Sequence, residues 1–273
     1  MLKTMRHLWY NIRVSKETEV CRVLDLHCHV LYHIDDGPDT LYESVRLCEM
    51  AVDNGIEGIA ATSHLYSCLD AADYVRRRDD RLERLREELQ TERMPLHLYA
   101  GAEVFIDEDI THARDLDRVT LNNSRYLLIE FAFRGLSARR LLYYIDTVYK
   151  MDLTPVVAHP ERYSFLQQDH ALVDYLVQRG VIFQINADSL AGRTGYEEFD
   201  LAYRMVRHNA ASVIATDAHS HLSRTNDLLR MIRDFPPDIP RESLDYMLYR
   251  APAAILADKP LPPIRRSSLQ RVR

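Results

Sequence analysis

Cysteine is scarce in this 273-residue chain, and its four cysteines form no Cys-x-x-Cys pair. That spacing is typical of redox and zinc sites, so its absence favours a reduced, intracellular protein. The chain also lacks an excess of positive charge: 35 Lys and Arg against 41 Asp and Glu give a net charge of −6. This balance argues against general nucleic-acid binding. Residues 1–20 contain no continuous apolar run, so we expect neither a signal peptide nor membrane insertion, and a cytoplasmic location.

Apolar residues make up 47% of the chain, a content typical of a globular protein. The length suits one large domain with a substantial core, and the sequence shows no internal repeat or long linker. We therefore predict three parts, namely an N-terminal extension over 1–22, one domain over 23–257, and a basic tail over 258–273.

Short apolar runs alternate with helix-like segments along this domain. Seven runs predict strands, at residues 23–26, 56–62, 96–100, 125–129, 154–158, 181–185 and 212–216. Helices are expected between them. The first is capped by Asp39 or Thr40 and stopped at Asn54-Gly55. The others are expected at 70–92, 137–150, 169–179, 196–208, 225–234 and 241–257. Such alternation predicts an α/β fold of parallel βα units, which a barrel closes naturally with its active site at the C-terminal strand ends.

The first predicted strand leads into Asp25-Leu26-His27-Cys28-His29. Side chains at i and i+2 of a strand point to the same face, so the two imidazoles can hold one metal ion. Asp36 follows in the turn Asp35-Asp36-Gly37-Pro38 and adds an oxygen ligand. Asp25 has two interpretations at this stage: it orients a ligand histidine, or it caps the strand end.

The other predicted strands show the same feature, because six of the seven end in His, Asp or Glu. The residues are His27, His29, His64, Glu103, Glu130, His159, Asp217 and His219. The remaining strand ends in Asn186, a candidate for orienting a ligand. A single histidine after a strand is usually a loop residue, but this repetition favours a metal site. Mixed imidazole and carboxylate ligands suit zinc, manganese or iron, and their number exceeds the needs of one ion.

These strand-end motifs together resemble a known superfamily. The motifs are Asp25-Leu26-His27-Cys28-His29, Asp35-Asp36-Gly37-Pro38, Thr62-Ser63-His64, Gly101-Ala102-Glu103, Leu128-Ile129-Glu130-Phe131, His159-Pro160-Glu161-Arg162 and Thr216-Asp217-Ala218-His219. They are similar to those of the PHP (polymerase and histidinol phosphatase) superfamily over residues 23–225. More narrowly, Asp-Asp-Gly-Pro and His-Pro-Glu-Arg-Tyr resemble the bacterial manganese-dependent protein-tyrosine phosphatases of capsule and exopolysaccharide systems.

The resemblance implies a distorted (β/α)7 TIM-like barrel with two to three divalent metal ions. Manganese is the expected metal, and iron or zinc are the alternatives. By analogy, one ion would be held by His27, His29, Glu103 and Asp217. Glu103 would bridge to a second ion, completed by Glu130 and His159. The third would be held by Asp36, His64 and His219. Arg162 and Arg224 match family arginines, and we predict that they contact substrate phosphate.

The implied activity is a metal-dependent phosphotyrosine-protein phosphatase, in which metal-bound hydroxide attacks phosphorus in line. The implied partner is the tail of a bacterial tyrosine kinase of polysaccharide synthesis. The sequence does not specify the oligomeric state, and a homo-oligomer is one of the alternatives. A cysteine mechanism is disfavoured, because the thiolate phosphatases need Cys-x5-Arg and no cysteine here has arginine six positions on.

Two other enzyme classes remain at this stage. A small-molecule phosphoesterase such as histidinol phosphatase would use the same site with different loops, at 65–70, 104–124 and 187–195. A metal-dependent amidohydrolase or deaminase also has a barrel with His-x-His, but Arg162 and Arg224 argue against it because that class needs no phosphate-binding arginine.

Overall fold

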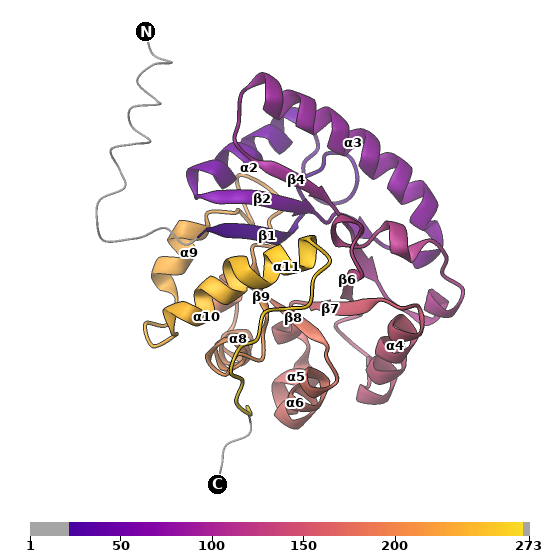
Figure 1. Cartoon of the computed structure of the whole chain (residues 1–273), viewed down its shortest axis with the longest axis vertical. Helices are drawn as coiled ribbons and strands as arrows, with labels where there is room; N and C mark the ends of the chain where they lie inside the picture. The colour runs from indigo at the N-terminus through magenta and orange to yellow at the C-terminus, as the bar shows by residue number, and fades with distance from the viewer. Residues whose placement is uncertain (1–21, 270–273) are drawn as a thin grey trace.

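The computed structural model describes residues 22–269 (Figure 1), so the predicted extension over 1–22 lies almost wholly outside the described residues. Nine parallel strands are present in this range. They are β1 (Val23–Cys28), β2 (Ile56–Ala61), β3 (His64–Leu65), β4 (His97–Ala100), β5 (Glu103–Phe105), β6 (Tyr126–Glu130), β7 (Thr154–Ala158), β8 (Ile182–Asn186) and β9 (Val213–Ala215). Seven of them match the predicted strands. The two short additions, β3 and β5, begin at His64 and Glu103.

The strands form two sheets, one of order β1-β2-β4 and one of order β3-β5-β6-β7-β8-β9. The predicted parallel α/β fold is thus confirmed. The predicted barrel is not, because the ladders of residues 22–269 form no closed sheet. No ladder joins β1 to β9; the residues that follow β9 hold the end of β1 around the bridge between Cys28 and Ala218, where Asp217 N donates to His27 O and His29 N donates to Ala218 O, each at 2.8 Å. β9 has three residues and the register of β1 shifts between Asp25 and Cys28, which leaves too few aligned amides for a ladder.

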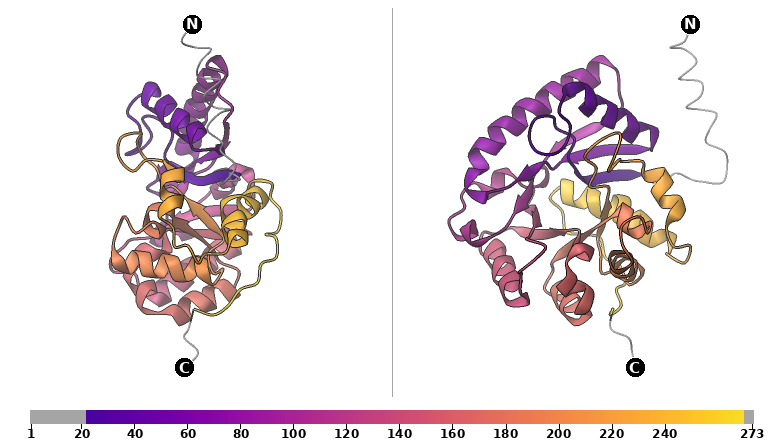
Figure 2. Two further views of the ribbon diagram at one scale, coloured as in Figure 1. Left: turned by 90° about the vertical axis from the view of Figure 1, so that its left-hand side faces the viewer. Right: turned by 180° about the vertical axis from the view of Figure 1, so that it is seen from behind.

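Ten α-helices accompany these strands in residues 22–269. They are α2 (Leu41–Asp53), α3 (Ala71–Thr91), α4 (Ala138–Lys150), α5 (Ser164–Gln168), α6 (His170–Gln178), α7 (Ala187–Leu190), α8 (Tyr196–Arg207), α9 (Leu228–Asp234), α10 (Arg241–Asp245) and α11 (Ala251–Leu256). Most lie around the outside of the two sheets, whereas α11 crosses their middle (Figures 1 and 2).

Local sequence explains where two of these helices begin. Thr40 and Glu43 form a reciprocal capping box at α2, so Thr40 rather than Asp39 is the cap. The predicted helix over 241–257 is divided instead into α10, a π-helical turn over Tyr246–Arg250, and α11. Pro252 stands in the first turn of α11 and has no N–H to donate to the preceding turn, which accounts for the irregularity.

Both faces of the strands are buried. Their outer face packs on the surrounding helices, and their inner face carries a separate apolar cluster that includes Leu24, Leu128 and Val156. Ile255 and Leu256 of α11 belong to the same inner cluster. Burial on two sides explains why the strands have continuous apolar runs. The candidate ligands lie at the carboxyl-terminal ends of these strands or in the loops that follow them.

The described part of the basic tail lies against the domain. Ser267 N donates to His208 O at 3.1 Å, and Leu269 N donates to the Asp174 carboxylate at 3.0 Å. Leu269 itself is buried. None of the helices in residues 22–269 has both the length and the apolar content needed to cross a bilayer.

Candidate metal centre

The carboxyl ends of the strands bring a first group of four candidate ligands together, namely His27, His29, Glu103 and Asp217. The Nε2 atom of His27 lies 3.1 Å from Glu103 Oε2 and 3.4 Å from Asp217 Oδ1. The Nε2 atom of His29 lies 3.3 and 3.5 Å from the same two oxygens. All four side chains are buried, and their donor atoms lie within 4.8 Å of one another.

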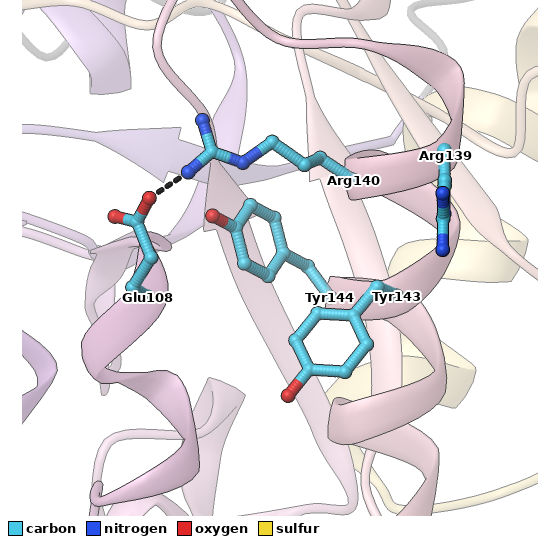
Figure 3. A pocket seen from close by; sticks show the side chains of 5 residues that line it. All are labelled: Glu108, Arg139, Arg140, Tyr143 and Tyr144. Carbon is cyan, nitrogen blue, oxygen red and sulfur yellow. Dashed lines mark ion pairs between the residues drawn. The ribbon is translucent and has the colours of Figure 1, made fainter.

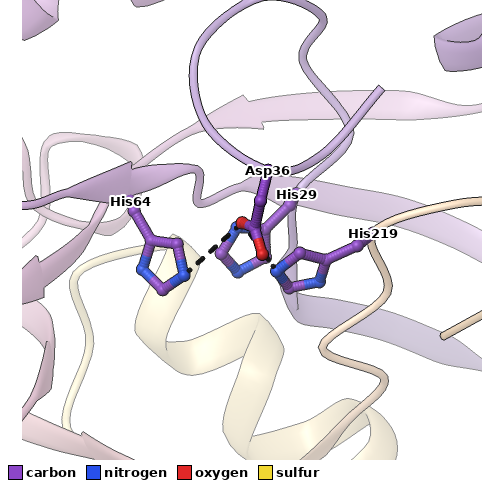
Figure 4. A group of neighbouring side chains, drawn as sticks. All are labelled: His29, Asp36, His64 and His219. Carbon is purple, nitrogen blue, oxygen red and sulfur yellow. Dashed lines mark ion pairs between the residues drawn. The ribbon is translucent and has the colours of Figure 1, made fainter. Parts of the chain in front are cut away.

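A second group shares His29 and adds Asp36, His64 and His219 (Figure 4). The Nε2 atom of His219 lies 3.3 Å from Asp36 Oδ1, and that of His64 lies 3.7 Å from the same oxygen. The rings of His29 and His219 stack with centroids 3.7 Å apart. Asp36 is the most exposed member, with 56% of its side chain accessible, so this group faces the outside of the site.

A third group consists of His64, Glu103 and Glu130. His64 Nδ1 lies 3.1 Å from Glu103 Oε2 and 3.0 Å from Glu130 Oε1. His159 joins it from β7, with Nε2 2.9 Å from Glu103 Oε1 and 3.8 Å from Glu130 Oε2. The structure therefore brings all nine predicted ligands into one connected cluster, and Glu103 lies between two of its groups.

Side chains behind the cluster orient these ligands. His27 Nδ1 lies 2.7 Å from Gln184 Oε1, which leaves His27 Nε2 facing the carboxylates. Gln184 Nε2 donates to Asn186 Oδ1, and Asn186 Nδ2 donates to Asp217 Oδ2 at 2.8 Å. The sequence indicates an orienting role for Asn186 but not for Gln184. The available signal was their spacing, because residues i and i+2 of a strand share a face.

Asp35 is a second residue that sequence analysis named only as part of a motif. Its Oδ2 atom lies 2.6 Å from His29 Nδ1 and accepts a hydrogen bond from His64 N at 2.6 Å. One carboxylate thus orients two candidate ligands. The turn requires Gly37, since a Cβ atom there would lie 2.6 Å from His29 O.

Asp25 belongs to the backbone support rather than to the imidazoles. Its carboxylate accepts hydrogen bonds from Thr216 N at 3.1 Å, Thr216 Oγ1 at 2.5 Å and His27 N at 3.3 Å. It therefore ties the middle of β1 to Thr216, the residue directly after β9, which is neither of the two roles considered from the sequence.

The cluster has a strongly negative electrostatic environment. Burial lowers the pKa of His27, but the Glu103 and Asp217 carboxylates outweigh burial and raise that pKa to about 9. Burial raises the pKa of Glu103, and the neighbouring His27 and His159 outweigh it, so the pKa falls well below the usual range. Burial and His29 together lower the pKa of His219 to about 4. Carboxylates that attract protons onto buried imidazoles would equally attract divalent cations.

Unpaired atoms test whether the residues fit such ions. Within residues 22–269, Glu103 Oε2, His64 Nδ1 and His219 Nε2 are buried and approach neighbouring polar atoms to 3.0–3.3 Å, yet none of the three has a partner aligned for a hydrogen bond. Buried polar atoms are normally paired, so orphaned atoms on converging imidazoles and carboxylates need another explanation. Coordination of a borderline-soft divalent ion would explain these unpaired atoms. The imidazoles and carboxylates present are suitable ligands for such an ion.

The two predicted phosphate-binding arginines lie at the edge of this cluster. Arg224 Nη2 lies 3.0 Å from Asp217 Oδ2, and Arg162 Nη1 lies 3.7 Å from the same oxygen. Their side chains are 46% and 35% exposed. Both guanidinium groups thus face solvent beside the candidate ligands, where an anionic substrate can reach them.

A separate recess of about 200 Å³ lies between α4 and the 3₁₀ turn over Glu108–Thr111 (Figure 3). Its lining consists of Glu108, Arg139, Arg140, Tyr143 and Tyr144. Arg140 forms an ion pair with Glu108 across it. Since it contains none of the candidate ligands, this recess is distinct from the metal centre.

We expect Gln184→Leu to weaken metal binding roughly 10- to 100-fold, the usual effect of removing a group that orients a ligand histidine. The change leaves His27 Nδ1 and Asn186 Oδ1 without their partners. Metal titration of purified variants measures the effect. Gln184→Glu is the matched control, because it keeps an acceptor for His27 and should recover part of the affinity. Unchanged affinity in Gln184→Leu would contradict the orienting role.

Fold and site together define the class: an α/β protein whose parallel strands end in a buried imidazole–carboxylate centre suited to metal ions, with arginines at its edge. The chain belongs to the CpsB/CapC family of capsular polysaccharide synthesis, whose family model matches residues 23–257. This membership confirms the resemblance drawn from the motifs.

Individual relatives cover most of the chain. The tyrosine-protein phosphatase YwqE of Bacillus subtilis is 31% identical over 263 residues, which span 90% of this chain and 98% of YwqE. The tyrosine-protein phosphatase CpsB of Streptococcus agalactiae is 27% identical over 205 residues, 72% of this chain and 83% of CpsB. A crystal structure from work on YwqE and Streptococcus pneumoniae CpsB, described as unique metal-dependent tyrosine phosphatases, superimposes with a TM-score of 0.78 at 29% identity. The match covers 91% of this chain and all of the other.

Proposed function

We propose that this chain is a metal-dependent phosphatase that hydrolyses phosphotyrosine in proteins of capsule or exopolysaccharide synthesis. One observation carries the proposal: nine converging imidazole and carboxylate ligands lie beside two exposed arginines, in a member of a family whose relatives are named tyrosine-protein phosphatases. We assign the activity to residues 23–257, the range that the family model matches.

The proposed ligands are His27, His29, Asp36, His64, Glu103, Glu130, His159, Asp217 and His219. They would hold two or three divalent ions, for which manganese is the first choice. When bound, such ions would neutralise the phosphate ester and make a water molecule nucleophilic near neutral pH. A distorted (β/α)7 barrel is part of the same proposal, and the contacts between the ends of β1 and β9 support it.

The chain's own residues would bind and orient the substrate. A phosphate monoester is a dianion, and the guanidinium groups of Arg162 and Arg224 can donate paired hydrogen bonds to its oxygens. Both groups now pair with Asp217 Oδ2, so a phosphoryl group would compete with that oxygen for them. Asn186 would keep Asp217 in place during this exchange through its 2.8 Å hydrogen bond to Oδ2.

The proposed partner is the phosphorylated tail of a bacterial tyrosine kinase, inside the cytoplasm. Three described cysteines, Cys28, Cys48 and Cys68, are free thiols, which fits a reducing compartment. Such tails are flexible, and they would reach a centre whose outer group includes the exposed Asp36.

Hydrolysis of a substrate panel tests the function. Protein reconstituted with Mn²⁺ should release phosphate from a phosphotyrosine peptide, much faster than from the matching phosphoserine peptide or from histidinol phosphate, and a chelator should abolish the activity. A preference for histidinol phosphate would instead identify a small-molecule phosphoesterase. Absence of phosphate release from all three would overturn the proposal.

A further inference from the structure

Two aromatic side chains are exposed at the same edge of the molecule as the metal centre. Tyr66 is 60% exposed and follows β3, whereas Phe133 is 41% exposed and follows β6. Both strands belong to one parallel sheet, so the loops after them emerge at the same edge. Isolated exposed apolar residues are common on protein surfaces. What these two rings contact therefore decides whether they are significant.

Each ring lies beside one candidate ligand histidine. The Tyr66 ring stacks on His64 with centroids 5.0 Å apart and an angle of 28° between the planes. The Phe133 ring is tilted against His159 with centroids 5.6 Å apart. His64 and His159 both contact Glu103, at 3.1 and 2.9 Å. The two exposed rings thus accompany the two histidines that meet at the same carboxylate.

Phe133 is also held from a second direction. The guanidinium carbon of Arg162 lies 4.5 Å from the centre of the Phe133 ring, and the buried Tyr163 ring stacks on it at 5.5 Å. These contacts fix the position of Phe133. They also place an aromatic surface directly beside the proposed phosphate-binding arginine.

We propose that Tyr66 and Phe133 form two walls that contact the aromatic ring of the substrate ester and so select aryl over alkyl phosphates. The inference rests on the proposed function and adds the residues that decide its specificity. A phenyl ring gains from offset or edge-to-face contact with another aromatic ring, whereas the short alkyl ester of phosphoserine has no such surface. The walls and the arginines would then recognise the two halves of one phosphotyrosine side chain.

The binding of two non-hydrolysable phosphonates tests whether Tyr66 and Phe133 contact the aryl group of a ligand, independently of catalysis. Calorimetry on the metal-loaded protein compares phenylphosphonate with methylphosphonate. Wild type should bind phenylphosphonate more tightly, and Tyr66→Ala or Phe133→Ala should each reduce this ratio about three- to tenfold, the range expected for losing one aromatic contact. Tyr66→Phe and Phe133→Tyr should keep the ratio, because they keep the ring.

Tyr175→Ala is the matched control, since Tyr175 is a 48% exposed aromatic on α6 with an arginine beside it and lies outside the cluster. Its ratio should equal that of wild type. The proposed role of the two rings would be contradicted if the ratio of phenylphosphonate to methylphosphonate affinity were unchanged in both Tyr66→Ala and Phe133→Ala. It would also be contradicted if wild type showed no preference for phenylphosphonate. Failure of the proposed function is a different result, namely no hydrolysis of phosphotyrosine by a wild-type protein that binds phosphonates.

Discussion

Glu103→Ala is expected to remove both bound metal and phosphatase activity. Glu103 contacts His27, His64 and His159 at 3.1, 3.1 and 2.9 Å, so one substitution alters more than one ligand group. The loss of activity should exceed the roughly 10- to 100-fold effect of losing an orienting residue. Loss of an ion should also lower stability, by about 2.7 kcal/mol for an ion present at a hundred times its Kd.

Elemental analysis, phosphate release and melting temperature on the same preparation check this expectation. Wild type should contain more than one transition-metal ion per chain. Glu108→Ala is the matched control, because Glu108 follows the same strand but lies in the separate recess with Arg140 (Figure 3). It should keep metal and activity. A Glu103→Ala protein with wild-type metal content and activity would contradict the bridging role.

Arg162→Ala is expected to lower kcat/KM on the order of 10²- to 10³-fold, as for loss of one preorganised group that stabilises transition-state charge. Metal content and melting temperature should stay unchanged. A guanidinium group has hydrogen-bond donors only, so it cannot ligate a cation. The 3.7 Å separation from Asp217 Oδ2 is a weak ion pair, and Arg162 is therefore available to a substrate anion.

Related variants separate charge from geometry. Arg162→Lys should recover only part of the activity, because a point charge cannot reproduce the bidentate fork. Arg224→Ala should have a milder effect of the same kind. Arg204→Ala on α8 is the control, since Arg204 is a partly exposed arginine in an ion pair with Asp200 away from the cluster. It should match wild type.

The competing explanation is that Arg162 braces the loop after His159 through Asp217. In that case Arg162→Ala would lose metal and thermal stability together. Kinetics, metal content and melting temperature measured on one purified variant decide between the two roles. An unchanged kcat/KM toward phosphotyrosine would refute the substrate-binding role outright.

Elements with a strong local signal were predicted well. β6 and β7 have apolar runs bounded by polar residues, and the cap at Thr40 follows from the Thr-x-x-Glu spacing. β3 and β5 were missed because segments of two and three residues carry no periodicity. They exist through pairing with each other, in which His64 lies opposite Glu103.

For the candidate site too, some residues could be predicted from the sequence and others could not. Most candidate ligands follow predicted strands closely, and parallel strands end at one edge, so the convergence of these residues could be expected from the order of strands and helices. Gln184 could not, because a glutamine in a buried strand shows its role only when His27, 157 positions away, comes within 2.7 Å of it. The same holds for the link from Asp25 to Thr216, which are 191 positions apart.

By itself, the sequence determined the parallel α/β class, the chemistry of the candidate ligands and the family, because residue type and short-range spacing carry that information. Only the tertiary structure decided that the strands of residues 22–269 pair as two sheets, that Gln184 and Asp35 orient the histidines, and that Tyr66 and Phe133 lie beside them. These features depend on distances between segments far apart in the chain. Such distances arise from how helices and strands pack, which no local pattern of residues specifies.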